Sequence, residues 1–280
     1  MRFSKLYGFL ALPRSYFSLT ASPAIATLVS VLVGVSELTN LTLLCLFFLF
    51  STAFLNSYNN LMDARSDALT KDRFPIPLGL VTFSEALLFI GLAFTAAAVT
   101  ATIISGVSNL AGYVAFTNLA LAFLYSAPKI RLKRYPLVKG GVLVAHTLLF
   151  PYTTANLMLG QNPLNRINPL LPLLLVGLAV HTIQDIGDVE GDKVMGDKTL
   201  PIILGVKKSV LLSLTLLLAS GGLLALYEAP YKAIGLGFIA IQIPFLSVLY
   251  VREKMWKHVF WITSILSSGV VASILYGCCG

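Results

Sequence analysis

Two groups of carboxylates carry most of the chemistry that this sequence could perform. The chain has only 12 acidic residues, and eight of them fall in two short segments that follow long apolar runs: Asp63, Asp67 and Asp72 in the first segment, and Asp185, Asp188, Glu190, Asp192 and Asp197 in the second. Ionisable groups next to membrane hydrocarbon are costly and are often functional. Like charges at helical spacing also repel one another, which indicates that a cation offsets them.

The spacing within each group predicts a helix that presents its polar residues on one side. Asn59, Asp63 and Asp67 are four residues apart, and the second group has spacings of three and four at Asp185, Asp188 and Asp192. An internal repeat links the groups, because Asp-x-x-x-Asp is followed by PIPLG in the first copy and by PIILG in the second. Two copies separated by an even number of membrane spans would emerge on the same face and oppose one another across a bundle.

Opposed oxygen ligands favour a hard divalent cation. Mg²⁺ is usually held by a few carboxylates while phosphate oxygens and water complete its octahedron. Calcium is an alternative, whereas zinc would require His or Cys. The simpler alternative is that the aspartates cap helices or pair with nearby Lys and Arg. The repeated spacing favours metal binding at four of them: Asp63, Asp67, Asp188 and Asp192.

A basic segment supplies the opposite charge. After Tyr125 and Ser126, the eleven residues from 129 to 139 include five basic residues: Lys129, Arg131, Lys133, Arg134 and Lys139. Part of this charge orients the chain in a membrane. Beside metal-bridged carboxylates, however, such a segment predicts a site for a polyanion, because guanidinium groups grip phosphate oxygens in pairs. A diphosphate fits better than a carboxylate metabolite, which would not need two metal clusters.

The composition predicts that the protein folds in a lipid membrane. Hydrophobic residues make up 57% of the 280 residues, charged residues 11%, and the mean hydropathy is +0.85, which is typical of a polytopic membrane protein. Apolar runs near the length that spans a bilayer predict an all-α bundle of nine transmembrane helices in a single domain over residues 1–280. The runs cover residues 18–36, 41–58, 84–105, 107–127, 137–159, 169–184, 207–227, 229–250 and 257–278.

The distribution of charge predicts how the bundle is oriented. With a cytoplasmic N-terminus, all basic residues except Arg166 and Lys232 fall on the inner side. The net charge of +8 is then explained by a cytoplasmic face that meets anionic lipid headgroups and an anionic substrate. Nucleic acid is not needed as a partner. The sequence gives no indication of protein partners.

These residues resemble the UbiA superfamily of intramembrane prenyltransferases. The segment NNLMDARSD from Asn59 is similar to the family's Asn-Asp-x-x-Asp-x-x-x-Asp motif, and Asp188 to Asp192 are similar to its Asp-x-x-x-Asp motif. RFPIPLG from Arg73 and the tyrosine-bearing basic segment LYSAPKIRLKR also match, so the likeness spans nearly the whole chain. One departure is Asn60, which stands where the family usually has Asp. An amide can coordinate a metal through its carbonyl, but the site has one negative charge fewer.

The resemblance implies a Mg²⁺-dependent enzyme that moves a polyprenyl group from a prenyl diphosphate to a lipid-phosphate or aromatic acceptor in the bilayer, at a cytoplasmic active site. The expected metal ligands are Asn59, Asn60, Asp63, Asp67, Asp185, Asp188 and Asp192, with Asp63, Asp67, Asp188 and Asp192 as the catalytic residues. The expected diphosphate-binding residues are Arg14, Arg73, Tyr125, Lys129 and Arg131. The alternatives are a terpene cyclase on the same scaffold and, in a different class, a membrane transporter.

Overall fold

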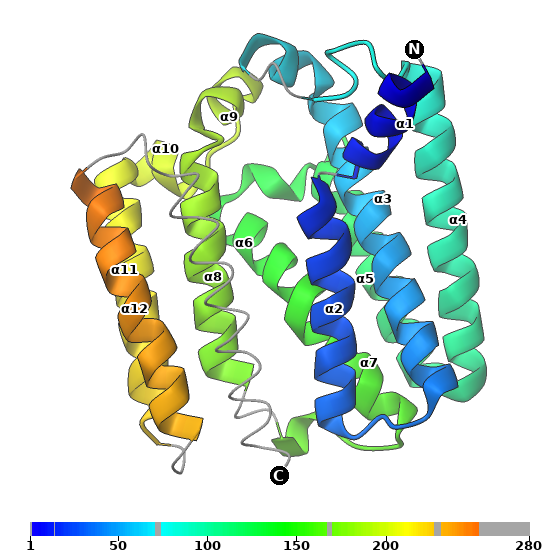
Figure 1. The fold of residues 1–280 in the computed structure, drawn as a ribbon, viewed down its shortest axis with the longest axis vertical. Coiled ribbons are helices and arrows are strands. Elements are labelled where there is room, and N and C mark those ends of the chain that lie inside the picture. Colours follow the sequence, from blue (N-terminus) through cyan, green and yellow to red (C-terminus); the bar gives the residue numbers. More distant parts are fainter. Residues whose placement is uncertain (1, 14, 71–73, 167–169, 227–230, 252–280) are drawn as a thin grey trace. The chain divides into compact units, whose positions relative to one another are not determined.

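The computed structural model describes residues 2–13, 15–70, 74–166, 170–226 and 231–251, and every regular element in these ranges is helical (Figure 1). The predicted all-α class is therefore confirmed. The chain divides into two compact units. The first comprises Met1–Lys133 and Leu149–Pro163, and the second comprises Arg134–Leu148 and Leu164–Gly280.

The first unit contains the N-terminal helices and one later helix: α1 (Arg2–Ala11), α2 (Ser15–Val33), α3 (Leu38–Thr70), α4 (Phe83–Val107), α5 (Asn109–Ser126) and α7 (Phe150–Met158). Helix α3 is central, because it packs against α2, α4 and α5 (Figure 1). Its apolar half buries Leu44, Phe47 and Phe48 completely. One serine, Ser108, ends α4 and caps the first turn of α5 through its hydroxyl, so these two helices are joined by a single residue.

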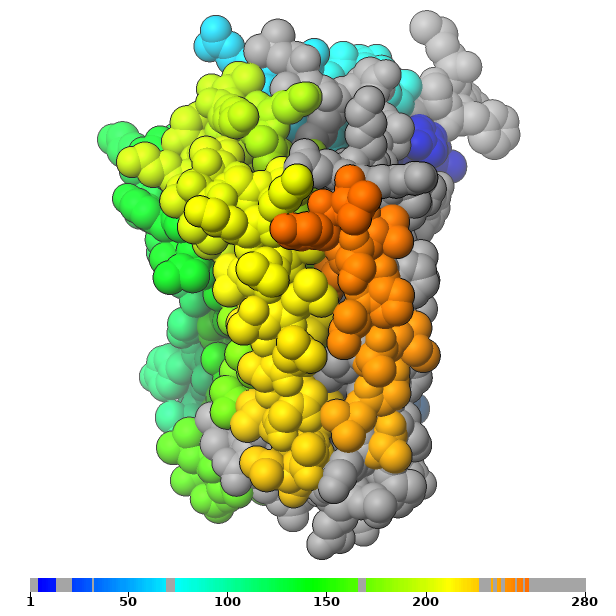
Figure 2. Space-filling model, turned by 90° about the vertical axis from the view of Figure 1, so that its left-hand side faces the viewer, coloured from blue at the N-terminus to red at the C-terminus, as the bar shows by residue number. Residues whose placement is uncertain are grey.

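The second unit contains α6 (Pro136–Val144), α8 (Leu170–Ile186), α9 (Val189–Met195), α10 (Leu200–Leu204), α11 (Val206–Leu224) and α12 (Tyr231–Val251). Helix α8 packs against α6 and α11, and α11 and α12 lie side by side (Figure 2). Two serines of α11 donate hydrogen bonds to carbonyls of α8, Ser213 to Ala179 and Ser220 to Pro172. Such polar contacts hold helices together where the solvent is as apolar as their side chains.

The helices follow the predicted apolar segments. Each predicted segment up to residue 250 overlaps described helix, and the segment predicted at 137–159 is α6, a π-helical turn (Ala145–Leu149) and α7 in succession. Within the described residues, α3, α4 and α11 are long and apolar enough to cross a membrane, and α8 with α9 would add a fourth span if that bent pair is counted as one. The segment predicted at 257–278 lies outside the described residues.

The sequence repeat has a matching backbone feature in each unit. Gly79 closes the turn after α3 at φ +67°, and Gly205 closes α10 at φ +82°. Both are left-handed conformations that glycine adopts without steric cost. In each unit this glycine stands shortly before the next long helix, α4 in the first and α11 in the second.

Candidate active site

Helix α3 positions the first carboxylate group as predicted. It does not end with its apolar run but continues to Thr70, so Asn59, Asp63 and Asp67 lie one turn apart along one helix. All three side chains are buried, with residue exposures of 6%, 7% and 3%. Buried carboxylates require charged or hydrogen-bonding partners, because an isolated charge in a protein interior is very unfavourable.

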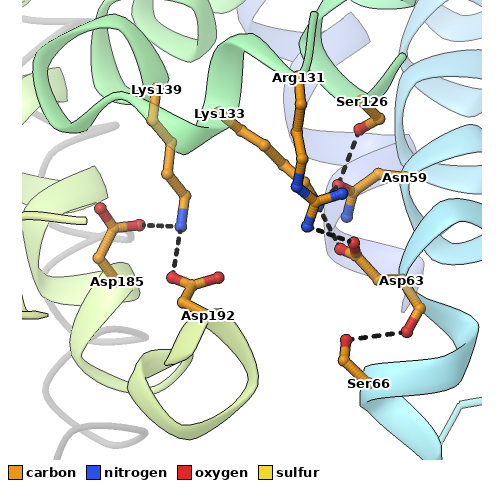
Figure 3. A network of polar contacts seen from close by, with 9 residues as sticks. All are labelled: Asn59, Asp63, Ser66, Ser126, Arg131, Lys133, Lys139, Asp185 and Asp192. Carbon is orange, nitrogen blue, oxygen red and sulfur yellow. Dashed lines mark hydrogen bonds and ion pairs between the residues drawn. The ribbon is translucent and has the colours of Figure 1, made fainter. Parts of the chain in front are cut away.

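Two basic residues of the segment after α5 supply such partners to Asn59 and Asp63. The Arg131 guanidinium donates to Asp63 Oδ1 at 3.0 Å, and Lys133 Nζ contacts Asp63 Oδ2 (Figure 3). The same ammonium donates to Asn59 Oδ1 at 2.6 Å, and the Ser126 hydroxyl donates to that oxygen at 3.0 Å. We call these five residues, all in the first unit, the α3 network.

The backbone at Arg131 is held in an unusual conformation. Its φ is +44°, a left-handed value that residues other than glycine adopt rarely and at a cost of about 1 kcal/mol or more. Arg131 is nevertheless 5% exposed and paired with Asp63. Strained residues of this kind cluster at functional sites, where the surrounding contacts outweigh the strain.

The second carboxylate group is organised by a bend. The prediction that Asp185, Asp188 and Asp192 share one side of a continuous helix is wrong, because α8 ends at Ile186, α9 begins at Val189 and their axes differ by 78°. Gly187, a poor helix former, lies in the break. In a straight helix Asp185 and Asp192 would be about 10 Å apart along the axis.

The bend brings two of these carboxylates to one ammonium. Lys139 Nζ, from α6, lies 2.7 Å from Asp185 Oδ1 and 3.1 Å from Asp192 Oδ2 (Figure 3). The lysine and Asp185 are buried, and Asp192 is half-buried. We call these three residues, all in the second unit, the α8–α9 network.

The remaining predicted site residues occupy varied positions. Asp188 is half-buried at the position that precedes α9, Tyr125 is buried at the end of α5, and Lys129 is exposed in the turn after it. Asn60 is buried, and its Nδ2 donates to the Leu12 carbonyl at 2.6 Å. Arg14 and Arg73 lie outside the described residues.

Sequence reasoning missed three members of the two networks as site residues. Lys133, Lys139 and Ser126 lie in the basic segment, but their types and spacing predict no role for them at the carboxylates. The available signal was the alternative stated for the sequence, that the aspartates pair with nearby Lys and Arg. Lys133 and Lys139 are the lysines of that segment that are buried, whereas Lys129 is exposed.

The donor set of each network fits a hard cation. The oxygens come from carboxylates and one amide, which are the ligands that Mg²⁺ and Ca²⁺ take in proteins. Within the described residues, no group of three or more His, Cys, Asp and Glu side chains converges in a way that could hold a metal ion. Mg²⁺ is commonly held by one or two carboxylates together with substrate phosphates.

A family model decides what kind of protein this is. The model of the UbiA prenyltransferase family matches residues 20–265. The chain belongs to this family. It is therefore an enzyme, a prenyltransferase of the membrane, rather than the transporter that charged membrane helices also allow.

Curated relatives of this UbiA-family chain agree with the assignment. It is 30% identical to the digeranylgeranylglyceryl phosphate synthase of Pyrococcus furiosus, over 75% of this chain and 72% of that protein. The enzyme of the same name from Methanopyrus kandleri is also 30% identical, over 71% of this chain and 70% of that protein. Chlorophyll synthase of Arabidopsis thaliana is 25% identical over 69% of this chain and 51% of that protein.

Solved structures share the fold. A structure described as giving structural and mechanistic insights into digeranylgeranylglyceryl phosphate synthase in membranes aligns with a TM-score of 0.66 at 23% identity, over 98% of this chain and 99% of that one. A UbiA homolog from Archaeoglobus fulgidus bound to GPP and Mg²⁺ aligns with a TM-score of 0.68 at 18% identity, over 95% and 99%. At these identities the likeness establishes an all-helical membrane fold.

Proposed function

We propose that the protein transfers a polyprenyl group from a prenyl diphosphate to the hydroxyl of a glycerol-phosphate lipid, with Mg²⁺ as cofactor. The support for this acceptor is the 30% identity to two enzymes named digeranylgeranylglyceryl phosphate synthase over more than two thirds of both chains. An aromatic acceptor is the second candidate, favoured by the weaker similarity to chlorophyll synthase.

The two networks supply the groups that this reaction needs. Carboxylates of the α3 and α8–α9 networks, together with Asp67 and Asp188, would hold Mg²⁺, and Asn59 and Asn60 would add amide oxygens. When bound, the metal supplies positive charge that neutralises the departing diphosphate. Arg131, with Lys129, Tyr125, Arg14 and Arg73, would bind diphosphate oxygens. Cations fixed where negative charge develops lower the barrier to breaking the bond.

The proposed step balances without any redox partner. The bond between the first prenyl carbon and its diphosphate oxygen breaks, and its electron pair leaves with the diphosphate. A new bond forms from that carbon to the acceptor hydroxyl oxygen, whose proton passes to the released diphosphate. A cyclase would break the same first bond, and a carbon–carbon bond within the prenyl chain would then form.

The proposal includes a membrane topology with nine spans and a cytoplasmic N-terminus. Nine spans with a cytoplasmic N-terminus would bring the basic segment and both carboxylate groups to the cytoplasmic side, in accordance with the distribution of Lys and Arg. The diphosphate would then be bound at the membrane surface while the prenyl chain stays in the bilayer.

Product analysis tests the reaction class. The purified protein is given geranylgeranyl diphosphate and Mg²⁺ with a glycerol-phosphate lipid, with an aromatic acid, or with no acceptor, and the products are identified by mass spectrometry. We expect an ether-linked lipid in the first sample. A cyclic hydrocarbon formed without an acceptor would identify a cyclase instead.

Removing one carboxylate from each group should abolish turnover. Asp63→Ala and Asp188→Ala are each expected to reduce Mg²⁺-dependent product formation by about 100-fold or more, because each removes a proposed ligand of the Mg²⁺ whose positive charge would stabilise the leaving diphosphate. Glu190→Ala is the matched control, since Glu190 is an exposed acid on α9. Near-normal activity in either aspartate variant, with the purified protein still folded, would contradict the metal assignment.

A further inference from the structure

Each network contains one lysine that contacts the oxygens a metal would need. Lys133 Nζ contacts Asp63 and lies 2.6 Å from Asn59 Oδ1, and Lys139 Nζ lies between Asp185 and Asp192. The two lysines are six residues apart in sequence and belong to different units. The same arrangement, an ammonium on a carboxylate group, therefore occurs twice in one chain.

Both contacts are shielded from water. The side chains of Lys133 and Lys139 are 5% and 8% exposed, and those of Asp63 and Asp185 are 10% and 6% exposed. Salt screens buried charges little. An ammonium at these oxygens must therefore oppose the binding of a divalent cation to the same carboxylates, both by occupying their lone pairs and by repulsion between like charges.

A lysine is better suited to move from a carboxylate to a phosphate than Arg131, which shares Asp63 with Lys133. A lysine ammonium is a point charge on a flexible four-carbon chain, whereas a guanidinium forms a rigid fork. Arg131 contacts the other carboxylate oxygen of Asp63, Oδ1, at 3.0 Å. Lys133 can thus leave Asp63 by rotating its side chain, while Arg131 stays in place.

A diphosphate can replace the carboxylate oxygens as a partner for the lysine ammonium and can also bind Mg²⁺. Its oxygens accept hydrogen bonds from an ammonium and also coordinate Mg²⁺. Any ligand that takes a lysine away from a carboxylate makes that carboxylate available to the metal, and this coupling is reciprocal, so the metal must raise the affinity for diphosphate by the same factor.

We propose that Lys133 and Lys139 compete with the divalent metal for the carboxylates of the two networks, so that the metal binds strongly only together with a diphosphate. This inference rests on the proposed function, because it takes the networks to be the metal site of a diphosphate-dependent enzyme. It assigns Lys133 and Lys139 as positioning residues that set the order in which metal and diphosphate bind.

Metal affinity measured without turnover tests the proposal. Mn²⁺ binding to the full-length protein in detergent is followed by electron paramagnetic resonance at constant pH, with and without geranylgeranyl thiolodiphosphate, which resists cleavage. We expect Lys133→Gln and Lys139→Gln each to raise the affinity for Mn²⁺ alone by about tenfold or more, the effect of one nearby charge on a buried carboxylate. The added effect of the diphosphate analogue should shrink accordingly.

Three further variants separate the possible outcomes. Lys208→Gln removes the same charge from an exposed position on α11 and should bind Mn²⁺ as the wild type does. Lys133→Arg keeps the charge and should not gain affinity. Asp63→Asn should lose binding, which shows that the measured site is the α3 network.

The results that overturn the proposal are distinct from those that overturn the function. Unchanged or weaker Mn²⁺ binding in both glutamine variants, with binding still lost in Asp63→Asn, overturns the competition but leaves the metal site intact. Mn²⁺ binding that is absent from the wild type under both conditions overturns the competition and the proposed function together. If Lys133→Gln does not purify as a folded helical protein, Lys139→Gln makes the same test in the other unit.

Discussion

At the scale of the residue, Asn60 illustrates how one hydrogen bond can select a side chain. Its Nδ2 donates to the Leu12 carbonyl at 2.6 Å, and the side chain is 2% exposed. This contact ties α3 to the end of α1, where the Leu12 amide in turn donates to Gly8. An ionised aspartate has no donor, so Asn60 makes a contact that the family's usual Asp could not make.

We therefore expect Asn60→Asp to destabilise the protein. A carboxylate would face a carbonyl oxygen, and an unsatisfied buried polar group costs about 1–3 kcal/mol. Thermal unfolding of the purified protein should show a lower midpoint, whereas Asn165→Asp, at an exposed position, should unfold like the wild type. An unchanged or higher midpoint in Asn60→Asp would argue against the importance of the Leu12 contact.

Residue spacing predicted that Asn59, Asp63 and Asp67 share one helix, but it did not predict which side chains they contact. The spacing of Asn59, Asp63 and Asp67 placed them correctly on one helix, because helical periodicity is a local property. The contacts of Lys133 and Lys139 could not be predicted in this way. A long flexible side chain reaches a partner that the tertiary fold selects, and no local pattern encodes that choice.

At the scale of the element, the bend between α8 and α9 organises the second network. The acidic spacing fits a straight helix, and a single Gly187 is too weak a signal to predict a break. The turn forms because the amides of Gly187 and Asp188 bond to Gln184 and Asp185 three residues earlier. The acidic spacing therefore identified a polar segment correctly, but it predicted one straight helix where the structure has two helices joined by a bend.

The close packing of α6 on α8 suggests a second variant. A Cβ on Gly177 would lie 2.9 Å from Val144 Cγ2, which is closer than packed side chains allow. Gly177→Val should push α6 outward and move Lys139 away from Asp185, with an overpacking cost of about 1–3 kcal/mol. We expect activity to fall by about tenfold or more, since small displacements of catalytic groups are costly.

The matched control for this variant is Gly222→Val. A Cβ on Gly222, in α11, would meet no atom within 4 Å. Its activity, measured as prenyl transfer at saturating Mg²⁺, should be close to that of the wild type. Equal activity in Gly177→Val and Gly222→Val would mean that the distance between α6 and α8 does not matter for function.

At the scale of the whole molecule, the distribution of charge predicts which side of the membrane each loop faces. Cysteine labelling in intact cells tests this prediction, in a chain whose own cysteines are replaced by serine. Asn165→Cys should react with a membrane-impermeant thiol reagent from outside, whereas Lys193→Cys should react only after the membrane is opened. The reverse pattern would invert the topology and place the carboxylates on the outer side.

The apolar segments predicted the helices well because a bilayer imposes a length on every element that crosses it. The division of the segment at 137–159 between two units was not predictable from hydropathy. The π-helical turn Ala145–Leu149 is as apolar as its flanks, and the boundary between the units falls within it.

Helix α3 has 33 residues and is therefore about 50 Å long, whereas the hydrocarbon of a bilayer is only about 30 Å thick. We therefore expect its carboxylate end to extend beyond the lipid and its apolar end to remain inside. The two products of such an enzyme would consequently separate by solubility as they form. Diphosphate would dissolve in water and the prenylated lipid would diffuse away in the membrane. The reverse reaction needs both products at the site, so their separation would make it slow.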